Sequence, residues 1–261
     1  MTSKNPEYDF KWCPGCGDFG VRRALEGAVG RLTIEGEMPI ENNVVIAGIG
    51  CSGNMVHLLD GDQPYGFHGI HGRTLPVAMG VKMARPDLNV VVVAGDGDFL
   101  GIGAEHIAPQ AARNLNVAAI IMDNGVYGLT KGQSSPTTDL GAVTSSTPYG
   151  KAEEKIHPFQ MYLSAGVSYI ASTVSTQVKQ MSALMSEAMD HPNVDELHKR
   201  VIKLDSKVSI ATVYRTVKLF EEVGVVAKHD FKGDKARYEQ APQEHHDHLI
   251  DINTCLLYTS P

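Results

Sequence analysis

The sequence lacks any apolar run long enough to cross a membrane. Its longest uninterrupted apolar runs, residues 90–94 and 117–122, have the length of β-strands, whereas a membrane helix needs about 20 consecutive, mostly apolar residues. The N-terminal stretch MTSKNPEYDF contains no apolar signal core. We therefore expect a cytoplasmic protein with no membrane partner.

The sequence also has no excess of basic residues and little cysteine. Its 23 Lys and Arg stand against 30 Asp and Glu, a formal net charge of −7, which argues against a protein that is mainly a nucleic-acid-binding surface. The hydrophobic content of 43 % suffices for a core and excludes wholesale disorder. The four cysteines are Cys13, Cys16, Cys51 and Cys255. In a reducing compartment, such a set indicates metal or redox chemistry rather than disulfide bonds.

Glycine is nearly absent from the last quarter of the chain. Of the 26 glycines, only Gly224 and Gly233 lie beyond residue 190. The same stretch is richer in charge and contains six of the 11 histidines. Such a step in composition marks a domain boundary. We therefore predict one domain over residues 1–190, a second over 191–254 and a short tail over 255–261.

The first domain alternates apolar runs with stretches of helical periodicity. Residues 44–47, 90–94 and 117–122 are continuous apolar runs, and residues 75–83 and 105–113 between them favour helices. Runs of this kind are typical of parallel strands that are buried on both faces. The pattern predicts an α/β fold with a doubly wound parallel sheet, whose ligands bind at the carboxyl ends of the strands.

Two glycine-rich acidic loops follow the second and third apolar runs. The first is GDGD at 95–98 and the second is DNGVYG at 123–128. Mg²⁺ binds a few protein oxygens together with phosphate oxygens. Such protein oxygens are offered by Asp96, the Asn124 side chain and a carbonyl near Val126. A helix N-terminus beyond such a turn favours an anion such as a diphosphate. The alternative for either loop taken alone is a tight turn without a ligand.

Further motifs extend this pattern along the chain: WCPGCGDFG at 12–20, GIGCSG at 48–53, YGFHGIHGRTLPVAMGVKMARPDL at 65–88 and DNGVYGLTKGQSSPT at 123–137. Over residues 10–190 the sequence resembles the beta subunit of 2-oxoacid:ferredoxin oxidoreductases, which bind thiamine diphosphate. The resemblance implies that Asp96, Asn124 and the Val126 carbonyl hold Mg²⁺. It also implies the residues that line thiamine diphosphate: Ile49, Gly50, Cys51, Ser52, His68, Gly97, Asp98, Gly128 and Leu129.

The resemblance implies an enzyme activity as well. The reaction is the oxidative decarboxylation of a 2-oxoacid to an acyl-CoA, with electrons passed through a [4Fe–4S] cluster to ferredoxin. We expect 2-oxoglutarate as the substrate, although pyruvate and branched-chain 2-oxoacids share these motifs. The glutamate that activates the cofactor belongs to the alpha subunit, so we assign no catalytic residue to this chain and expect it to be inactive alone. The implied partners are the alpha subunit, ferredoxin, coenzyme A and the 2-oxoacid.

Three cysteines lie in the motifs of the first domain. Cys13 and Cys16 form a CPGC turn, and Cys51 lies in the GIGCSG loop beside the expected cofactor. These are three of the four thiolates that a [4Fe–4S] cluster needs. Cys255 lies in an unrelated segment, so the fourth ligand is missing. The alternatives for a bare CxxC are half of a zinc site or a redox-active pair.

The second domain has a compact helical pattern followed by a hairpin signal. A helix is expected to start at Asn193. A second helix is expected after Ser209, with apolar Val213, Val217 and Phe220 at helical spacing. Two short runs, 225–230 and 236–239, flank a Lys-Gly-Asp turn and indicate a hairpin. This order predicts a partial winged helix-turn-helix. The segments HPNVDELHKRV, SIATVYRTVKLFEEVGVV and RYE with HHDHLI resemble the ferric uptake regulators over residues 191–254.

That second resemblance implies a metal-responsive, DNA-binding transcriptional regulator. Tyr214 and Arg215 would contact DNA. A transition metal such as Zn²⁺ or Fe²⁺ would be held by Glu239, His245, Asp247 and His248. The alternatives are a solvated helix face for the DNA-contact residues and a polar loop for the metal set.

Both resemblances are incomplete, and they meet at a His-Pro dipeptide at 191–192. The first lacks its fourth cluster cysteine, and the second lacks its first DNA-binding helix and its dimerisation domain. Residues 255–261, CLLYTSP, depart from the regulator pattern, and we expect them to be an artefactual tail. The hypothesis is a chimera of two truncated genes, in which DNA is a partner only if the second segment is functional. The alternative is a genuine fusion of a metal sensor with an iron–sulfur enzyme.

Overall fold

The computed structural model describes residues 12–34, 38–59, 65–113, 116–167, 169–189, 198, 201–202, 206–223 and 226, and the backbone alone of 227–229, 237–240, 249–250 and 257–258. The chain divides into two units, Met1–Asp190 and His191–Pro261. Among the described residues, no helix is both long and apolar enough to cross a membrane.

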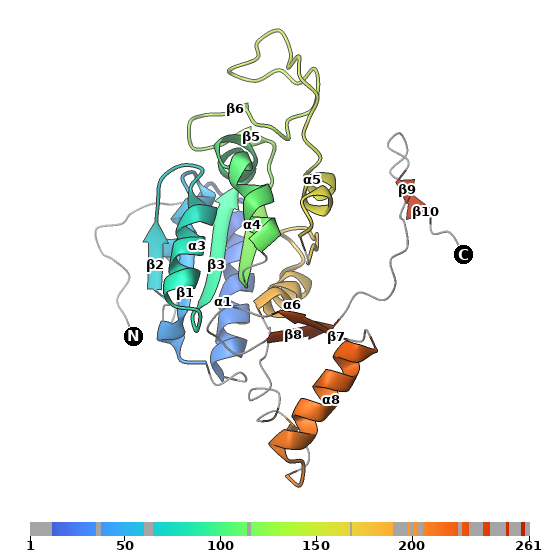
Figure 1. Ribbon diagram of the computed structural model, residues 1–261. Helices are drawn as coiled ribbons and strands as arrows, with labels where there is room; N and C mark the ends of the chain where they lie inside the picture. Colours follow the sequence, from blue (N-terminus) through green and yellow to red (C-terminus); the bar gives the residue numbers. More distant parts are fainter. Residues whose placement is uncertain are drawn as a thin grey trace. The chain divides into compact units, whose positions relative to one another are not determined.

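The first unit is built on a four-stranded parallel sheet (Figure 1). Three strands coincide with the apolar runs: β1 (Asn43–Ala47), β3 (Asn89–Gly95) and β4 (Val117–Met122). The fourth, β2 (Tyr65–His68), is an exposed edge strand beside β1. The order β2-β1-β3-β4 places β3, whose first six residues are all buried, between two neighbours. The expected parallel sheet is therefore confirmed, with one more strand than the apolar runs indicated.

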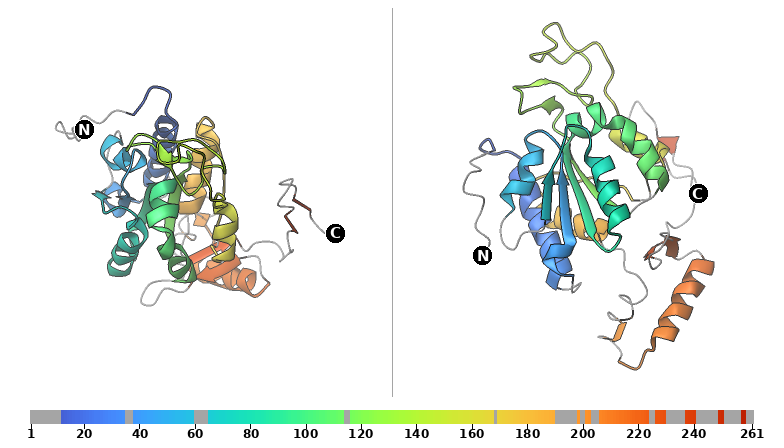
Figure 2. Two further views of the ribbon diagram at one scale, coloured as in Figure 1. Left: turned by 90° about the horizontal axis from the view of Figure 1, so that it is seen from above. Right: turned by 60° about the vertical axis from the view of Figure 1, so that its left-hand side comes forward.

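Helices cover both faces of this sheet (Figures 1 and 2). One face packs on α1 (Asp18–Ile34) and α6 (Val178–Met189), and the other on α3 (Thr74–Ala84) and α4 (Ile107–Arg113). Alternate side chains of one strand enter opposite cores: Val91 and Val93 face α1, whereas Val90 and Val92 face α3. Full burial of one such side chain contributes about 1.5–3 kcal/mol. Strands that are apolar on both faces therefore favour a sheet with helices packed on each side.

Short elements connect the strands at their carboxyl ends. The loop after β1 contains the 3₁₀ turn η2 (Ser52–Asn54) and α2 (Met55–Leu58). The loop after β3 contains the π-helical turn η3 (Gly97–Ile102) and η4 (Ala104–His106). After β4 come the small hairpin β5 (Val126–Tyr127) and β6 (Gln133–Ser134) and then α5 (Pro158–Ser164). The 3₁₀ turn η1 (Ile40–Asn42) precedes β1 at the opposite end.

In the second unit, α8 (Ile210–Glu222) is followed by the antiparallel pair β7 (Val226–His229) and β8 (Arg237–Gln240). The Ser209 hydroxyl accepts a hydrogen bond from the Thr212 N–H at 3.2 Å, as expected of a helix N-cap. Val213 and Val217 are buried against Val201, Val208 and Val226. Residues 198 and 201–202 are helical. Two further short strands are β9 (Leu249–Ile250) and β10 (Leu257–Tyr258).

One apolar position of this unit was predicted wrongly. Phe220, which the helical spacing placed on the buried side of α8, is exposed. The described hydrophobic partners of α8 pack against Val213 and Val217, which precede Phe220 by seven and three residues. Spacing alone cannot tell how far along a helix its packing partner extends.

Candidate functional site

The loops that follow β1, β2 and β3 are joined by one carboxylate. The Ile49 N–H and the Gly72 N–H both donate to Asp98 Oδ1, at 3.1 and 2.8 Å. His71 Nδ1 lies 2.6 Å from the same oxygen. Asp98 is 2 % exposed, so these contacts take place out of water, where charge-assisted hydrogen bonds are strong. Asp98 therefore links the three loops at the edge of the sheet where the carboxyl ends of its parallel strands meet.

The second oxygen of Asp98 has no such partners. Asp98 Oδ2 is buried and makes no hydrogen bond within the described part of the chain. It lies so close to Gly48 that any side chain at residue 48 would collide with it. A buried carboxylate oxygen without a donor is costly. This oxygen is therefore a ready acceptor for a donor group on a ligand.

The three expected Mg²⁺ ligands lie on the adjacent loops after β3 and β4. Asp96 follows β3 and is 1 % exposed. The backbone N–H of Asn124 lies 3.5 Å from Asp96 Oδ1. Asn124 Oδ1 accepts a hydrogen bond from the Val126 N–H at 3.0 Å, which closes the turn that carries both residues. The fold thus brings together two oxygen-bearing side chains and a tight turn whose carbonyls are close by.

The surroundings of these residues are electronegative. Asp96 and Asp98 raise the pKa of the Tyr127 hydroxyl, after burial as the larger cause. Burial first, and then Asp123 and Asp96, hold the pKa of Tyr162 far above its ordinary value. A divalent cation bound among these carboxylates would offset the repulsion between them and provide the positive charge that a diphosphate needs. The donor set therefore fits Mg²⁺ with a diphosphate.

Several residues expected to line the cofactor are placed at the same edge. Cys51 Sγ and Asn124 Nδ2 would lie 3.7 and 3.8 Å from a side-chain carbon at Gly128. The GIGCSG loop therefore comes close to the loop after β4. Ser52, Gly97 and Asp98 are buried, Gly50 and His68 are half-buried, and Ile49 and Leu129 are exposed.

His68 is held by a second histidine that sequence reasoning missed. His57 Nε2 lies 2.9 Å from His68 Nδ1. Burial, and to a lesser extent His68, lowers the pKa of His57. His68 Nε2 is buried without a hydrogen-bond partner among the described residues, and it would lie 3.1 Å from a side-chain carbon at Gly53. The pair thus leaves one imidazole nitrogen free beside the GIGCSG loop.

Cys16 and Cys51 pack against the core that α1 helps to form, and Cys13 lies close enough to affect the Cys51 thiol. The Cys16 N–H donates to the Cys13 carbonyl at 3.0 Å in a tight turn. Burial, and more weakly Asp18 and the neighbouring cysteines, raise the pKa of the Cys51 thiol. The Trp12 indole donates to the Cys51 carbonyl at 2.8 Å and so ties the two segments together.

These cysteines do not complete a metal site on their own. Cys13, Cys16 and Cys51 are all free thiols. The part of the chain that the structure describes contains no group of three or more His, Cys, Asp or Glu that could hold a metal ion. A [4Fe–4S] cluster takes four thiolates, and Cys255 lies outside the described residues. The three thiols therefore do not form a metal-binding group as they are placed here, and they would also lack a fourth thiolate for a cluster.

The expected regulator-type site is only partly described. Tyr214 and Arg215 lie exposed on α8, and Glu239 lies on β8, of which only the backbone is described. His245, Asp247 and His248 lie outside the described residues. The structure therefore places the two DNA-contact candidates on one helix and leaves the metal set a prediction.

Thr137, beyond β6, also reaches the loops of the expected Mg²⁺ ligands, and Lys151 contacts the residues on either side of it. The Thr137 hydroxyl lies 2.8 Å from Asp96 Oδ2 and 2.7 Å from Asp123 Oδ1. The buried Lys151 donates to carbonyls beside Thr137. Sequence reasoning did not identify either residue. The sequence offered no signal for Lys151, while the segment QSSPTT, which is rich in hydroxyl groups, offered only a weak one for Thr137.

Comparison with known proteins agrees with this site. Residues 48–195 match the family model of the C-terminal TPP binding domain of thiamine pyrophosphate enzymes, and residues 172–256 match that of the ferric uptake regulator family. The beta subunit of 2-oxoacid:ferredoxin oxidoreductase 2 from Aeropyrum pernix is 41 % identical over 69 % of this chain and 56 % of its own length. The corresponding subunit from Saccharolobus solfataricus is 38 % identical over 76 % of this chain and 69 % of its own length.

A solved structure extends the comparison to three dimensions. The 2-oxoglutarate:ferredoxin oxidoreductase from Magnetococcus marinus, with 2-oxoglutarate, coenzyme A and succinyl-CoA bound, is 40 % identical with a TM-score of 0.66. The match covers 71 % of this chain and 61 % of that one. The chain thus spans roughly three fifths of these relatives. It belongs to the thiamine-diphosphate-binding beta subunits of the 2-oxoacid:ferredoxin oxidoreductase family, and it carries a C-terminal segment of the ferric uptake regulator family.

Proposed function

We propose that residues 1–190 act as the beta subunit in the oxidative decarboxylation of a 2-oxoacid, with 2-oxoglutarate as the substrate. The observation that carries this proposal is the meeting of Asp96 with the Asn124–Val126 turn at the ends of β3 and β4. The choice of 2-oxoglutarate is supported by the Magnetococcus marinus relative, which was solved with that 2-oxoacid.

Thiamine diphosphate would be held at the carboxyl edge of the sheet. Asp96, the Asn124 side chain and the Val126 carbonyl would hold its Mg²⁺. When bound, this cofactor supplies an electron sink for the decarboxylation of a 2-oxoacid. The lining residues would be the nine expected from the resemblance: Ile49, Gly50, Cys51, Ser52, His68, Gly97, Asp98, Gly128 and Leu129.

The chain's own residues would prepare this site before any ligand arrives. Asp98 fixes the loops after β1 and β2 through the Ile49 and Gly72 N–H groups, which holds the lining in place. Its free Oδ2 is available as a hydrogen-bond acceptor. His68 presents its unpaired Nε2 beside the GIGCSG loop, where it can form a hydrogen bond with a bound group.

The proposal requires partners. The glutamate that activates the cofactor would come from an alpha subunit, the acyl acceptor would be coenzyme A, and the electron acceptor would be ferredoxin. Cys13, Cys16 and Cys51 would supply three thiolates to a [4Fe–4S] cluster, whose fourth ligand must come from elsewhere. We derive no electron-transfer step from these three thiols.

Calorimetric titration of the full chain with thiamine diphosphate, with and without Mg²⁺, tests the proposal. We expect binding that depends on Mg²⁺ and that Asp96→Ala abolishes, because the buried carboxylate is the charged ligand of the set. Asp87→Ala is the matched control, since Asp87 is exposed and pairs with Arg85. If the unsubstituted chain shows no Mg²⁺-dependent binding even together with an alpha subunit, the proposal is wrong.

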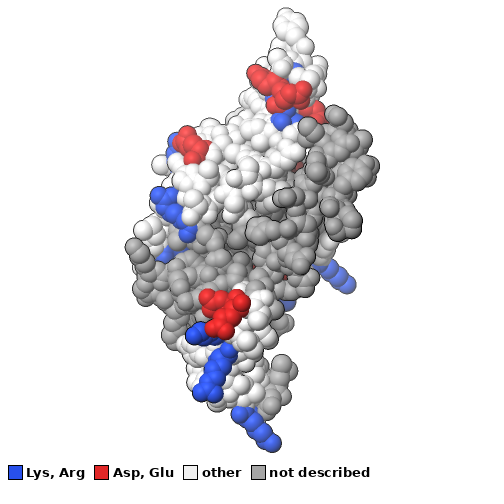
Figure 3. Space-filling view, turned by 45° about the vertical axis from the view of Figure 1, so that its right-hand side comes forward, with Lys and Arg blue, Asp and Glu red and all other residues white. Residues whose placement is uncertain are grey.

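A second candidate function concerns the C-terminal segment. The match of residues 172–256 to the ferric uptake regulators supports a metal-responsive, DNA-binding role in which Tyr214 and Arg215 contact DNA. Glu239, His245, Asp247 and His248 would hold Zn²⁺ or Fe²⁺. Residues 191–261, however, contain 10 Lys and Arg against 11 Asp and Glu, and in Figure 3 acidic side chains lie beside some of the described basic ones. DNA binding needs clustered Lys and Arg. In a gel shift with and without Mn²⁺, we expect no sequence-specific complex.

We also propose that the two segments come from separate genes. The two family matches overlap only over residues 172–195, and neither family supplies a role for the other. Amplification of source DNA across codons 185–200 tests this hypothesis, because one continuous genomic product would establish a genuine fusion.

A further inference from the structure

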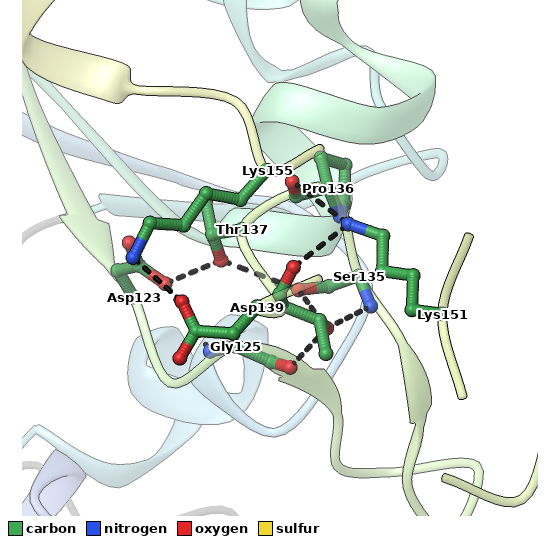
Figure 4. A network of polar contacts seen from close by, with 9 residues as sticks. Asp123, Gly125, Ser135, Pro136, Thr137, Asp139, Lys151 and Lys155 are labelled. Atoms are coloured by element: carbon green, nitrogen blue, oxygen red, sulfur yellow. Dashed lines mark hydrogen bonds and ion pairs between the residues drawn. The ribbon is translucent and has the colours of Figure 1, made fainter. Parts of the chain in front are cut away.

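A segment beyond β6 docks onto both loops that bear the expected Mg²⁺ ligands. Figure 4 shows its contacts with Asp123 and Gly125 on the loop after β4. The Thr137 hydroxyl reaches Asp96 Oδ2 on the loop after β3 and Asp123 Oδ1 at the end of β4, at 2.8 and 2.7 Å. The Thr138 hydroxyl donates to the Gly125 carbonyl. Thr137 and Thr138 therefore form hydrogen bonds from one segment to the loops after β3 and β4.

Asp96 and Asp123 both accept from the Thr137 hydroxyl, which has a single proton, and donation to Asp96 orients that carboxylate. A hydroxyl has one proton to donate, and when Thr137 donates it to Asp96 Oδ2, the other oxygen, Oδ1, remains on the side of Asn124. That is the side on which the second expected ligand lies. Threonine suits this task because its β-branched side chain is stiff about χ1.

A buried lysine holds this threonine in place. Lys151 is 7 % exposed, and its Nζ donates to the carbonyls of Thr138 at 2.8 Å and of Pro136 at 3.4 Å. These two carbonyls belong to the residues on either side of Thr137. The Lys151 N–H also donates to the Ala142 carbonyl at 2.9 Å, so the lysine is fixed at its backbone and at its tip. Burial of an ammonium group is costly, which makes this placement difficult to explain as a surface contact.

We propose that Thr137 is a positioning residue for the Mg²⁺ ligand Asp96, and that Lys151 positions Thr137. This inference rests on the proposed function, because it assigns a role toward the cation of that same site. Side chains that hydrogen-bond to metal ligands fix ligand orientation, and their loss typically lowers metal affinity about 10- to 100-fold.

The test measures metal binding without turnover. The full chain is saturated with thiamine diphosphate and titrated with Mn²⁺, with the free ion measured by electron paramagnetic resonance. We expect Thr137→Val, which keeps the shape and removes the hydroxyl, to raise the dissociation constant by about 10-fold or more. Thr137→Ser restores most of the affinity because it returns the donor. Lys151→Met weakens binding in the same direction.

Matched controls separate positioning from loss of fold. Thr144→Val removes a hydroxyl of the same segment that contacts Thr147 and Ser146, and Lys179→Met removes an exposed lysine of α6. Both should bind Mn²⁺ like the unsubstituted chain. Failure of Thr137→Ser to restore affinity indicates a merely structural residue and overturns the inference.

The two proposals fail in different ways. If the unsubstituted chain binds no Mn²⁺ together with thiamine diphosphate, even in the presence of an alpha subunit, the proposed function is overturned, and this inference with it. If the unsubstituted chain binds and Thr137→Val binds equally well, the inference alone is overturned.

Discussion

The contact between Gly97 and Tyr127 allows a quantitative prediction. A side-chain carbon at residue 97 would lie 2.7 and 2.8 Å from Cδ1 and Cζ of the Tyr127 ring, and still closer to Cε1. Carbon atoms in contact are normally about 3.5–4.0 Å apart. The ring cannot simply move away, because the Tyr127 hydroxyl donates to the Gly97 carbonyl at 3.1 Å. Gly97→Ala must therefore displace the hairpin that starts at Val126.

We expect Gly97→Ala to lower the free energy of unfolding by about 1–3 kcal/mol, the usual cost of overpacking. Urea unfolding followed by tryptophan fluorescence measures this change, because Trp12 is the single tryptophan, is 5 % exposed and belongs to the first unit. Gly30→Ala is a control of opposite sign. Gly30 lies inside α1 with no heavy atom within 4 Å of an added carbon, so alanine should stabilise that helix by about 0.5–1 kcal/mol.

A double-mutant cycle shows whether the Tyr127 ring is the cause. In a Tyr127→Leu background the ring is absent, so most of the cost of Gly97→Ala should disappear. The coupling between the two positions should then lie within the range of about 0.5–3 kcal/mol that residues in contact show. If Gly97→Ala costs the same in both backgrounds, or costs nothing in the natural one, the steric reasoning is refuted.

Two further predictions concern pH and the second unit. Burial and His68 lower the pKa of His57 below its ordinary value of 6.5. The His57 imidazole therefore binds a proton more tightly in the unfolded chain than in the folded one, and the free energy of unfolding should fall as the pH drops below 6.5. Urea unfolding at several pH values should show a smaller slope in His57→Gln, and equal slopes would contradict this. Ser209→Ala should destabilise α8 by about 1 kcal/mol through loss of its N-cap. Amide hydrogen exchange of α8 measures this change, with Ser206→Ala as the control. Unchanged protection of the α8 amides in Ser209→Ala would argue against the cap.

Much of the sheet and its site could be predicted from local patterns. The strands β1, β3 and β4 are continuous apolar runs, because strands buried on both faces need no polar side. Asp96 and Asn124 could be placed together, because the carboxyl ends of neighbouring parallel strands meet at one edge. The cap at Ser209 follows from a purely local hydrogen bond.

Other features carried no local signal. The edge strand β2, with the sequence Tyr-Gly-Phe-His, is mostly exposed, so no apolar run marked it, and it is a strand because β1 offers a free edge. Phe220 has the spacing of a buried residue, yet the described packing partners of α8 cover only its earlier turns. Both cases depend on a neighbour from another part of the chain.

The amino-acid order determined the positions of the strands, the glycine-rich loops at their ends and the types of ligand that these loops offer, because each depends on residues close together in sequence. Folding alone determined the environment of those ligands. Thr137 reaches Asp96 across 41 residues, and Asp98 joins segments 49 and 26 residues away. Lys151 is buried because the loop folds back on itself. Hydrogen bonds act over about 3 Å in space whatever the separation along the chain, so only the tertiary arrangement could bring these partners together.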